Sequence, residues 1–282
     1  MKIIKNIKEI KKILNEHRNN NQQIALVPTM GALHEGHISL IKKANQLAEI
    51  VVVSIFVNKT QFNDLSDYEK YPRQLNLDFC KLENQQVDYI FAPDSQEIFP
   101  ENCDFIISPQ ALANCLCGSS RAGHFEGVAL IITKLFNIIL PNFAIFGQKD
   151  FQQLLIIKKL VENLNFNVEI HEVETLREAS GLAMSSRNQR LNDDQLKLAS
   201  EIFRILNEIK NNFYLDPQIL EKKSQEMLAI GFKKVEYLEV RDEQNLQLIS
   251  SFQINKPMRI FIAVYLDEVR LIDNLKLIKF IT

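Results

Sequence analysis

The chain of 282 residues lacks the features that define several large classes of protein. It has no apolar run of the ~18–20 residues that a membrane-spanning helix needs, and residues 1–6 lack the continuous apolar region of a signal peptide. Its 33 basic and 35 acidic residues leave a net charge of −2, so no global field attracts nucleic acid or an anionic membrane. Any polyphosphate must therefore bind in a local pocket.

Cysteine is also scarce. The four cysteines have neither the paired spacing of a zinc site nor the pattern of a disulfide framework. We expect free thiols in a reducing cytoplasm. The residues concerned are Cys80, Cys103, Cys115 and Cys117.

Apolar runs that are typical of buried strands alternate with helical patterns over residues 1–175. This alternation predicts an α/β fold with a doubly wound parallel sheet. The expected strands are 24–28, 51–57, 87–91, 143–146 and 168–173, with a further candidate at 105–107; the expected helices are 7–19, 38–50, 72–83, 127–140 and 151–164.

The pattern changes after residue 175, where helices precede extended segments. We expect helices at 192–212 and 217–230, then strands at 235–241, 258–266 and 269–275. This order predicts a smaller C-terminal α+β domain with an antiparallel sheet, with boundaries at 1–175 and 176–282.

The segment Met30–His37 follows the first of these apolar runs and precedes an amphipathic helix. A helix N-terminus offers unpaired N–H groups and the positive end of the helix dipole, so it suits phosphate. His34 and His37 are three residues apart and share one face of the first turn, where imidazoles can donate to phosphate. The alternatives are half of a metal site, with only two ligands, or two surface histidines. Phosphate chemistry is the favoured reading.

Other candidates lie at the ends of other expected strands. Gly147–Asp150 combines a glycine with Lys149, which can neutralise a phosphate; an ordinary helix start capped by Asp150 is about equally compatible. Met184–Arg187 offers two hydroxyls and a guanidinium that suit a triphosphate, although a solvated loop explains that segment alone.

Uncharged amides follow the strand 51–57. Asn58 and Gln61 suit a polar substrate that must be oriented, and turn chemistry or solvation is the alternative. The segment 121–125, which contains Arg121 and His124, is a further anion-binding candidate, or equally a structural loop. Each motif alone is weak, but together they converge at successive strand ends.

Together these motifs resemble the pantoate–β-alanine ligase family over essentially the whole chain. The matching segments are 28–37, 54–58 with Gln61 and Phe62, 71–73, 146–153 and 181–188. The chain departs from the family's usual residues at Lys59, Ala122, Gln148 and Ser180. These departures affect loop geometry and remove no presumed catalytic side chain.

The resemblance implies a Rossmann-like first domain, a cytoplasmic homodimer, and a reaction in two steps. ATP and (R)-pantoate give pantoyl adenylate and diphosphate, and β-alanine then displaces AMP to give pantothenate. It implies Mg²⁺ with ATP, through Asp78, and no tightly bound organic cofactor. The implied catalytic residues are His34, His37, Lys149, Ser185, Ser186 and Arg187; the implied ATP-binding residues are Met30, Gly31, Ala32, Leu33, His34, Glu35, Gly36, His37, Gly147, Gln148, Lys149, Asp150, Leu176, Met184, Ser185, Ser186 and Arg187; Gln61, Gln153, Asn58 and Arg121 are implied for pantoate or β-alanine.

Two alternatives remain. One is another nucleotidyltransferase with the same histidine motif and a different acceptor; the low net charge disfavours a version that charges tRNA. The other is a regulatory protein that binds ATP without catalysis.

Overall fold

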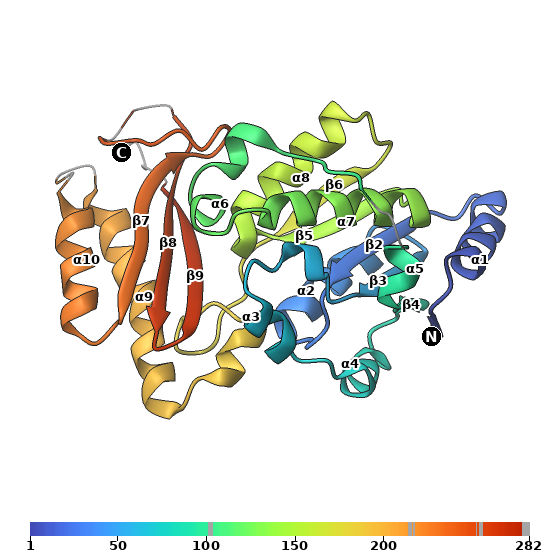
Figure 1. Cartoon of the computed structure of the whole chain (residues 1–282), viewed down its shortest axis with the longest axis horizontal. Coiled ribbons are helices and arrows are strands. Elements are labelled where there is room, and N and C mark those ends of the chain that lie inside the picture. Colours follow the sequence, from blue (N-terminus) through green and yellow to red (C-terminus); the bar gives the residue numbers. More distant parts are fainter. Residues whose placement is uncertain (101–103, 214–215, 217, 252, 254–255, 278–282) are drawn as a thin grey trace. The chain divides into compact units, whose positions relative to one another are not determined.

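The computed structural model describes residues 1–100, 104–213, 216, 218–251, 253 and 256–277, and its contacts divide the chain into two units. Unit 1 comprises Met1–Asn114, Gly118–Gln148 and Gln153–Glu174, and unit 2 comprises Cys115–Cys117, Lys149–Gln152 and Thr175–Thr282. Figure 1 shows the chain coloured along its sequence.

Unit 1 contains a six-stranded sheet in the order β1-β4-β3-β2-β5-β6, and every neighbouring pair is parallel. The predicted doubly wound parallel sheet is therefore confirmed. From β2 the chain proceeds to β3 and β4 on one side, and it later adds β5 and β6 on the other. The strands are β1 (Lys2–Ile4), β2 (Ile24–Thr29), β3 (Ile50–Ile55), β4 (Tyr89–Phe91), β5 (Phe143–Gly147) and β6 (Glu169–Val173).

Helix α2 packs on β2, β3 and β5, because its apolar face meets the buried strand side chains. Ile38 and Ile41 belong to one hydrophobic cluster with Val27, Val53 and Ile145. The helices of this part of the chain are α1 (Ile7–Asn19), α2 (Glu35–Asn45), α3 (Leu65–Lys70), α4 (Leu75–Leu82), α5 (Ser95–Ile98), α6 (Cys117–Ser120), α7 (His124–Ile139) and α8 (Phe151–Asn163), with 3₁₀ turns η1 (Lys59–Gln61), η2 (Gln110–Ala113) and η3 (Gln148–Asp150).

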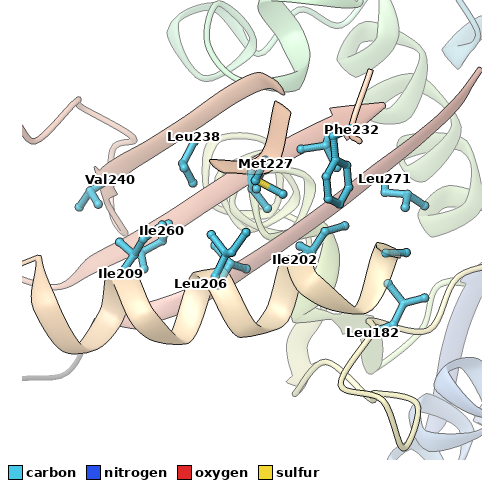
Figure 2. Close-up of a cluster of buried hydrophobic side chains, with 14 of the residues drawn as sticks. Leu182, Ile202, Leu206, Ile209, Met227, Phe232, Leu238, Val240, Ile260 and Leu271 are labelled. Carbon is cyan, nitrogen blue, oxygen red and sulfur yellow. The ribbon is translucent and has the colours of Figure 1, made fainter. Parts of the chain in front are cut away.

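Unit 2 contains the antiparallel sheet β7-β8-β9 and two longer helices, as predicted. Helix α9 presents Ile202, Leu206 and Ile209 to the strand residues Leu238 and Ile260, and these side chains form the core of the unit (Figure 2). The elements are η4 (Ser186–Arg190), α9 (Asp193–Asn212), α10 (Ile219–Ala229), β7 (Lys234–Asp242), β8 (Met258–Leu266) and β9 (Val269–Leu277).

Three expectations about local structure are corrected. Residues 105–107 form no strand, and Phe105 and Ile106 are 81% and 77% exposed. The edge beside β4 is instead occupied by β1, a strand too short to show a sequence period. Helix α2 begins at Glu35, earlier than predicted, because His34 caps it, and it also ends earlier than predicted, at Asn45.

Two expectations fall partly outside the described residues. Pro217, the expected start of a helix, and Cys103 are not described. The cysteines that are described, Cys80, Cys115 and Cys117, are free thiols. No helix in the described ranges is long and apolar enough to span a membrane.

Candidate active site

The carboxyl ends of three neighbouring strands in unit 1 carry the predicted motifs. Asn58 and Gln61 follow β3, Met30–His37 follows β2, and Gly147 ends β5. The strand order reverses beside β2, and open α/β sheets bind ligands at such a switch point. The fold therefore brings these unit 1 motifs to one edge of one sheet.

A tight turn links β2 to α2. Gly31 and Ala32 have φ values of 80° and 50°, in the left-handed region that favours glycine. A Cβ atom on Gly31 would lie 2.9 Å from Oδ2 of Asp78. Glycine is thus required at position 31 by both its conformation and its neighbour.

Asp78 on α4 holds this turn. Its Oδ2 accepts from the backbone N–H of Ala32 (3.0 Å) and its Oδ1 from that of Leu33 (2.8 Å), and the residue is fully buried. Lys81, one turn further along α4, donates to the Leu33 carbonyl. The role that these contacts show for Asp78 is to fix the backbone before His34.

The two histidines form a reciprocal cap at the start of α2. His34 Nδ1 accepts from the N–H of Gly36 (3.1 Å), and His37 Nδ1 accepts from the N–H of His34 (3.2 Å). A ring nitrogen that accepts carries no proton, so each neutral imidazole has its proton on Nε2. The ring centroids are 4.1 Å apart. Both imidazoles are thus held as Nε2–H donors at a helix N-terminus.

Gln61 is oriented by its neighbours. Its Oε1 accepts from Asn58 Nδ2 (3.1 Å), and its Nε2 donates to Met30 Sδ (2.9 Å). Asn58 Nδ2 also donates to the Gly127 carbonyl (3.0 Å), and Asn58 is 1% exposed. Asn58 therefore orients the side chain of Gln61 in this structure, and its own side chain is not exposed to a ligand.

Helix α7 supports the same segment from its N-terminal turn. His124 Nδ1 donates to the Gln61 carbonyl (2.8 Å), and Arg121 donates to that carbonyl (3.3 Å) and to His124 Nε2 (3.0 Å). A Cβ atom on Gly127 would lie 2.4 Å from the Thr60 carbonyl oxygen. His124 lies in the segment 121–125 that was considered for anion binding, and it supports Gln61 instead. Gly127 is a supporting residue that the sequence analysis missed.

Two further predicted residues lie after β5. Gln148 donates to Glu172 Oε1 (3.2 Å), which the family's usual glutamate could not do. Gln153 lies half-buried in the first turn of α8. A Cβ atom on Gly147 would come no closer than 3.9 Å to Leu40, so the protein itself leaves room at that glycine.

Unit 2 contains two of the predicted cationic residues, Lys149 and Arg187. Burial lowers the pKa of the Lys149 ammonium and Arg187 lowers it further, while Asp150 and Asp273 oppose both effects. No hydrogen bond or ion pair holds this ammonium within the described part of the chain. A lysine with a lowered pKa, close to a second cation, suits an anionic ligand.

The segment before Arg187 is ordered by a short hairpin. Arg177 and Ala183 form a β-bridge, and the N–H of Met184 donates to the Leu176 carbonyl (3.0 Å). Gly181 has a φ of 90°, and a Cβ atom there would lie 2.5 Å from Phe203.

The hydroxyl segment itself is not a solvated loop. Ser185 Oγ accepts from the N–H of Arg187 (3.2 Å) and caps η4, while Ser186 is 8% exposed. The amide of Asn188 donates to the Ala183 carbonyl (3.1 Å). The interpretation as a plain surface loop is therefore wrong for this segment.

A parallel α/β sheet with a histidine-capped helix N-terminus at its switch point defines a nucleotide-binding class of enzyme. The family model for pantoate-beta-alanine ligases matches residues 2–276. The chain belongs to this family.

Individual relatives agree over the full length. The pantothenate synthetase of Thermosipho africanus is 42% identical over 278 residues, 98% of this chain and 99% of that protein. The pantothenate synthetase structure from Thermus thermophilus has a TM-score of 0.91 at 34% identity, covering 98% of this chain and 99% of that one. A pantoate-beta-alanine ligase from Francisella tularensis, solved with beta-gamma ATP and beta-alanine, has a TM-score of 0.85 at 40% identity, covering 98% and 97%.

Proposed function

We propose that the chain condenses (R)-pantoate with β-alanine at the expense of ATP, through pantoyl adenylate, with release of AMP and diphosphate. The observation that carries the proposal is the pair of Nε2–H donors at the switch point, beside the oriented amide of Gln61, in a member of the pantoate–β-alanine ligase family. The pair suits phosphate and the amide suits a small polar acid.

In the first step a carboxylate oxygen of pantoate attacks the α-phosphorus of ATP. A new P–O bond forms, the bond from the α-phosphorus to the bridging oxygen breaks, and diphosphate leaves with the electron pair. His34 and His37 stabilise charge on the phosphate as Nε2–H hydrogen-bond donors. His37 is the position that the family resemblance assigns as proton donor, and as a neutral imidazole it donates a hydrogen bond and keeps its proton. Lys149, Ser185, Ser186 and Arg187 stabilise the leaving diphosphate.

In the second step the amine of β-alanine attacks the acyl carbon of the adenylate. A C–N bond forms, the bond from that carbon to the AMP oxygen breaks, AMP leaves with the electron pair, and the proton lost by the amine passes to solvent. Gln61 and Gln153 orient pantoate, and Gln61 also lies near β-alanine. Asn58 and Arg121 serve substrate binding through the Gln61 contacts described above.

The remaining proposed residues bind the nucleotide. The proposal for them comes from the family resemblance, and Gly147 among them leaves room for close approach of the nucleotide. These residues are Met30, Gly31, Ala32, Leu33, Glu35, Gly36, Gly147, Gln148, Asp150, Leu176 and Met184.

The described residues do not fit a Mg²⁺ ion held by the protein alone. No group of three or more His, Cys, Asp or Glu gathers among them, and both oxygens of Asp78 already accept backbone N–H groups. Mg²⁺ is commonly bound through substrate phosphates and few carboxylates. We therefore treat Mg²⁺ as part of the MgATP substrate and derive no step through it. The homodimer and the cytoplasmic location are proposed from family resemblance.

The test is exchange of labelled diphosphate into ATP by the purified chain. We expect exchange only when pantoate is present, and AMP release only when β-alanine is added. Pantoate-independent exchange would favour a nucleotidyltransferase with another acceptor. ATP binding without any exchange would favour a regulatory nucleotide-binding protein.

A further inference from the structure

Strand β9 carries two adjacent polar residues that the proposed mechanism does not use. Asp273 and Asn274 are 4% and 3% exposed. Because successive side chains of a strand point to opposite faces, such a pair can hold two separate segments. Buried polar groups of this kind need partners, and both residues have them within unit 2.

Asp273 holds the hairpin that leads into the hydroxyl segment. Its two oxygens accept from the two terminal nitrogens of Arg177, at 2.6 and 3.0 Å. The same guanidinium donates to the Gly181 carbonyl (3.1 Å) and lies 3.9 Å from the centre of the Phe203 ring. A bidentate, buried pair fixes direction as well as distance. Asp273 therefore sets the base of the hairpin that continues into Ser185.

Asn274 holds the backbone of Lys149. Its Nδ2 donates to the Lys149 carbonyl (2.8 Å), and its Oδ1 accepts from Arg259 (2.5 Å). A guanidinium can only donate, so the amide oxygen must face Arg259 and the amide nitrogen must face Lys149. The orientation of Asn274 is thus imposed by its neighbour.

Arg259 is itself fixed. Its guanidinium pairs with Glu243 (2.8 Å), where both side chains are largely buried, and it lies 3.9 Å from the centre of the Phe151 ring. Phe151 begins the helix that follows Lys149. The amide of Asn274 therefore contacts a guanidinium that Glu243 holds in place and that packs on Phe151, two residues after Lys149.

We propose that the Asp273–Asn274 pair is a positioning device, which sets the place of Lys149 and of the segment 185–187 relative to each other for ATP. The inference rests on the proposed function, because it assumes that both act on one nucleotide. Neither residue of the pair needs to touch the substrate.

The test begins with Asn274→Asp, which keeps the shape and the acceptor toward Arg259. It replaces the donor toward the Lys149 carbonyl by an oxygen, so it breaks the contact to Lys149. We expect kcat for pantoate-dependent exchange to fall about tenfold or more, with the KM for pantoate within about twofold, because the loss affects nucleotide geometry.

A second readout is the alkaline limb of the rate against pH. The charged groups that face Lys149 are Asp150, Arg187 and Asp273. Asp273→Asn removes a negative charge and moves the limb to lower pH, whereas Asn274→Asp adds one and moves it to higher pH. Opposite shifts show that both side chains lie within electrostatic reach of the Lys149 ammonium, as the inference requires. The fall in kcat of Asn274→Asp is the readout that a role confined to stability would not give.

The matched control is Asp242→Asn, a carboxylate of the same sheet that is 2% exposed and accepts backbone N–H groups at 2.7 and 3.2 Å. This substitution should lower the thermal stability. It should leave kcat, the KM for pantoate and the alkaline limb of the pH–rate profile unchanged. If Asp273→Asn does not fold, Asn274→Asp decides alone. The inference would be overturned if the wild type is active and Asn274→Asp changes neither kcat nor the alkaline limb of the pH–rate profile.

Failure of the proposed function gives a different result, since the wild type would then show no pantoate-dependent exchange. In that case competitive acylation of Lys149 against pH, read by mass spectrometry, still reports its titration. Opposite shifts in the two variants show that the Asp273–Asn274 pair lies within electrostatic reach of Lys149, as the inference requires, and identical titration in all three proteins contradicts it.

Discussion

The two units hold their candidate residues by different means. In unit 1 the histidines are fixed by backbone geometry close in sequence: a left-handed turn at Gly31 and Ala32, and a cap in which each ring accepts a nearby N–H. In unit 2 Lys149 and its neighbours are fixed by side chains distant in sequence, through Arg177–Asp273 and Asn274. Backbone geometry is encoded locally, whereas a charge network depends on the whole fold.

Although the two units hold their candidate residues by different means, we expect catalysis to need the residues of both. We expect His37→Ala in unit 1 and Lys149→Ala in unit 2 each to lower kcat by at least about 100-fold, because each removes a group that stabilises transition-state charge. Steady-state kinetics of pantothenate formation measure this.

The matched controls are His17→Ala and Lys8→Ala on α1, which should retain wild-type rates. His17 contacts Gln22 and Tyr89, and Lys8 is exposed, so neither lies at the carboxyl edge of the sheet. Near-wild-type turnover in either active-site variant would show that the proposed roles are misplaced and would break the comparison.

A smaller effect is expected where unit 1 does depend on a distant side chain. Asp78→Asn should lower kcat about tenfold by loosening the turn before His34, and should lower the free energy of unfolding by about 1–3 kcal/mol, since an amide nitrogen then faces a backbone donor. Kinetics and denaturant unfolding measure the two effects.

Asp88→Asn is the control, because Asp88 accepts from the Val51 N–H (2.8 Å) at the start of β3. It should affect stability alone. Equal losses of kcat in both variants would mean that Asp78 has no special link to the histidines.

The sequence predicted what local patterns encode. Apolar periodicity identified the parallel sheet of unit 1 and the antiparallel sheet of unit 2, and strand ends identified the motif around His34. The short strand β1 was missed because Lys2–Ile4 is too brief to show a period, and Phe105 was misplaced because a short apolar run can stay exposed.

Supporting contacts could not be predicted in the same way. Asp78 lies 46 residues from Ala32, Asp273 lies 96 residues from Arg177, and Asn274 lies 125 residues from Lys149. No periodicity or spacing connects residues so far apart. The candidate groups were therefore predictable, while most of the residues that orient them required the fold.

The smallest effect is expected at an exposed network in unit 2, which tests whether charge networks matter there only when buried. Arg204 on α9 pairs with Glu201 and Glu226 at 2.6 Å each and with Glu208, and Lys223 on α10 pairs with Glu208 and Glu226. Because the Arg204 side chain is 41% exposed, solvent screens these pairs. Arg204→Gln should cost only about 0.5–1 kcal/mol of stability and leave kcat unchanged.

The stabilisation that this exposed network provides depends on pH in a definite direction. Hydrogen bonds from Lys223, and then from Arg204, lower the pKa of Glu226, so its contribution is present above the unfolded pKa and is lost as the pH falls through the folded value. The stability difference between wild type and Arg204→Gln should therefore shrink in acid, and also in high salt.

The control is Lys197→Gln, whose partner Asp194 is 96% exposed. It should show no measurable stability difference from wild type at any pH. A loss of kcat in Arg204→Gln would show that even exposed charges of unit 2 position Lys149, and the division between buried and exposed networks would then fail.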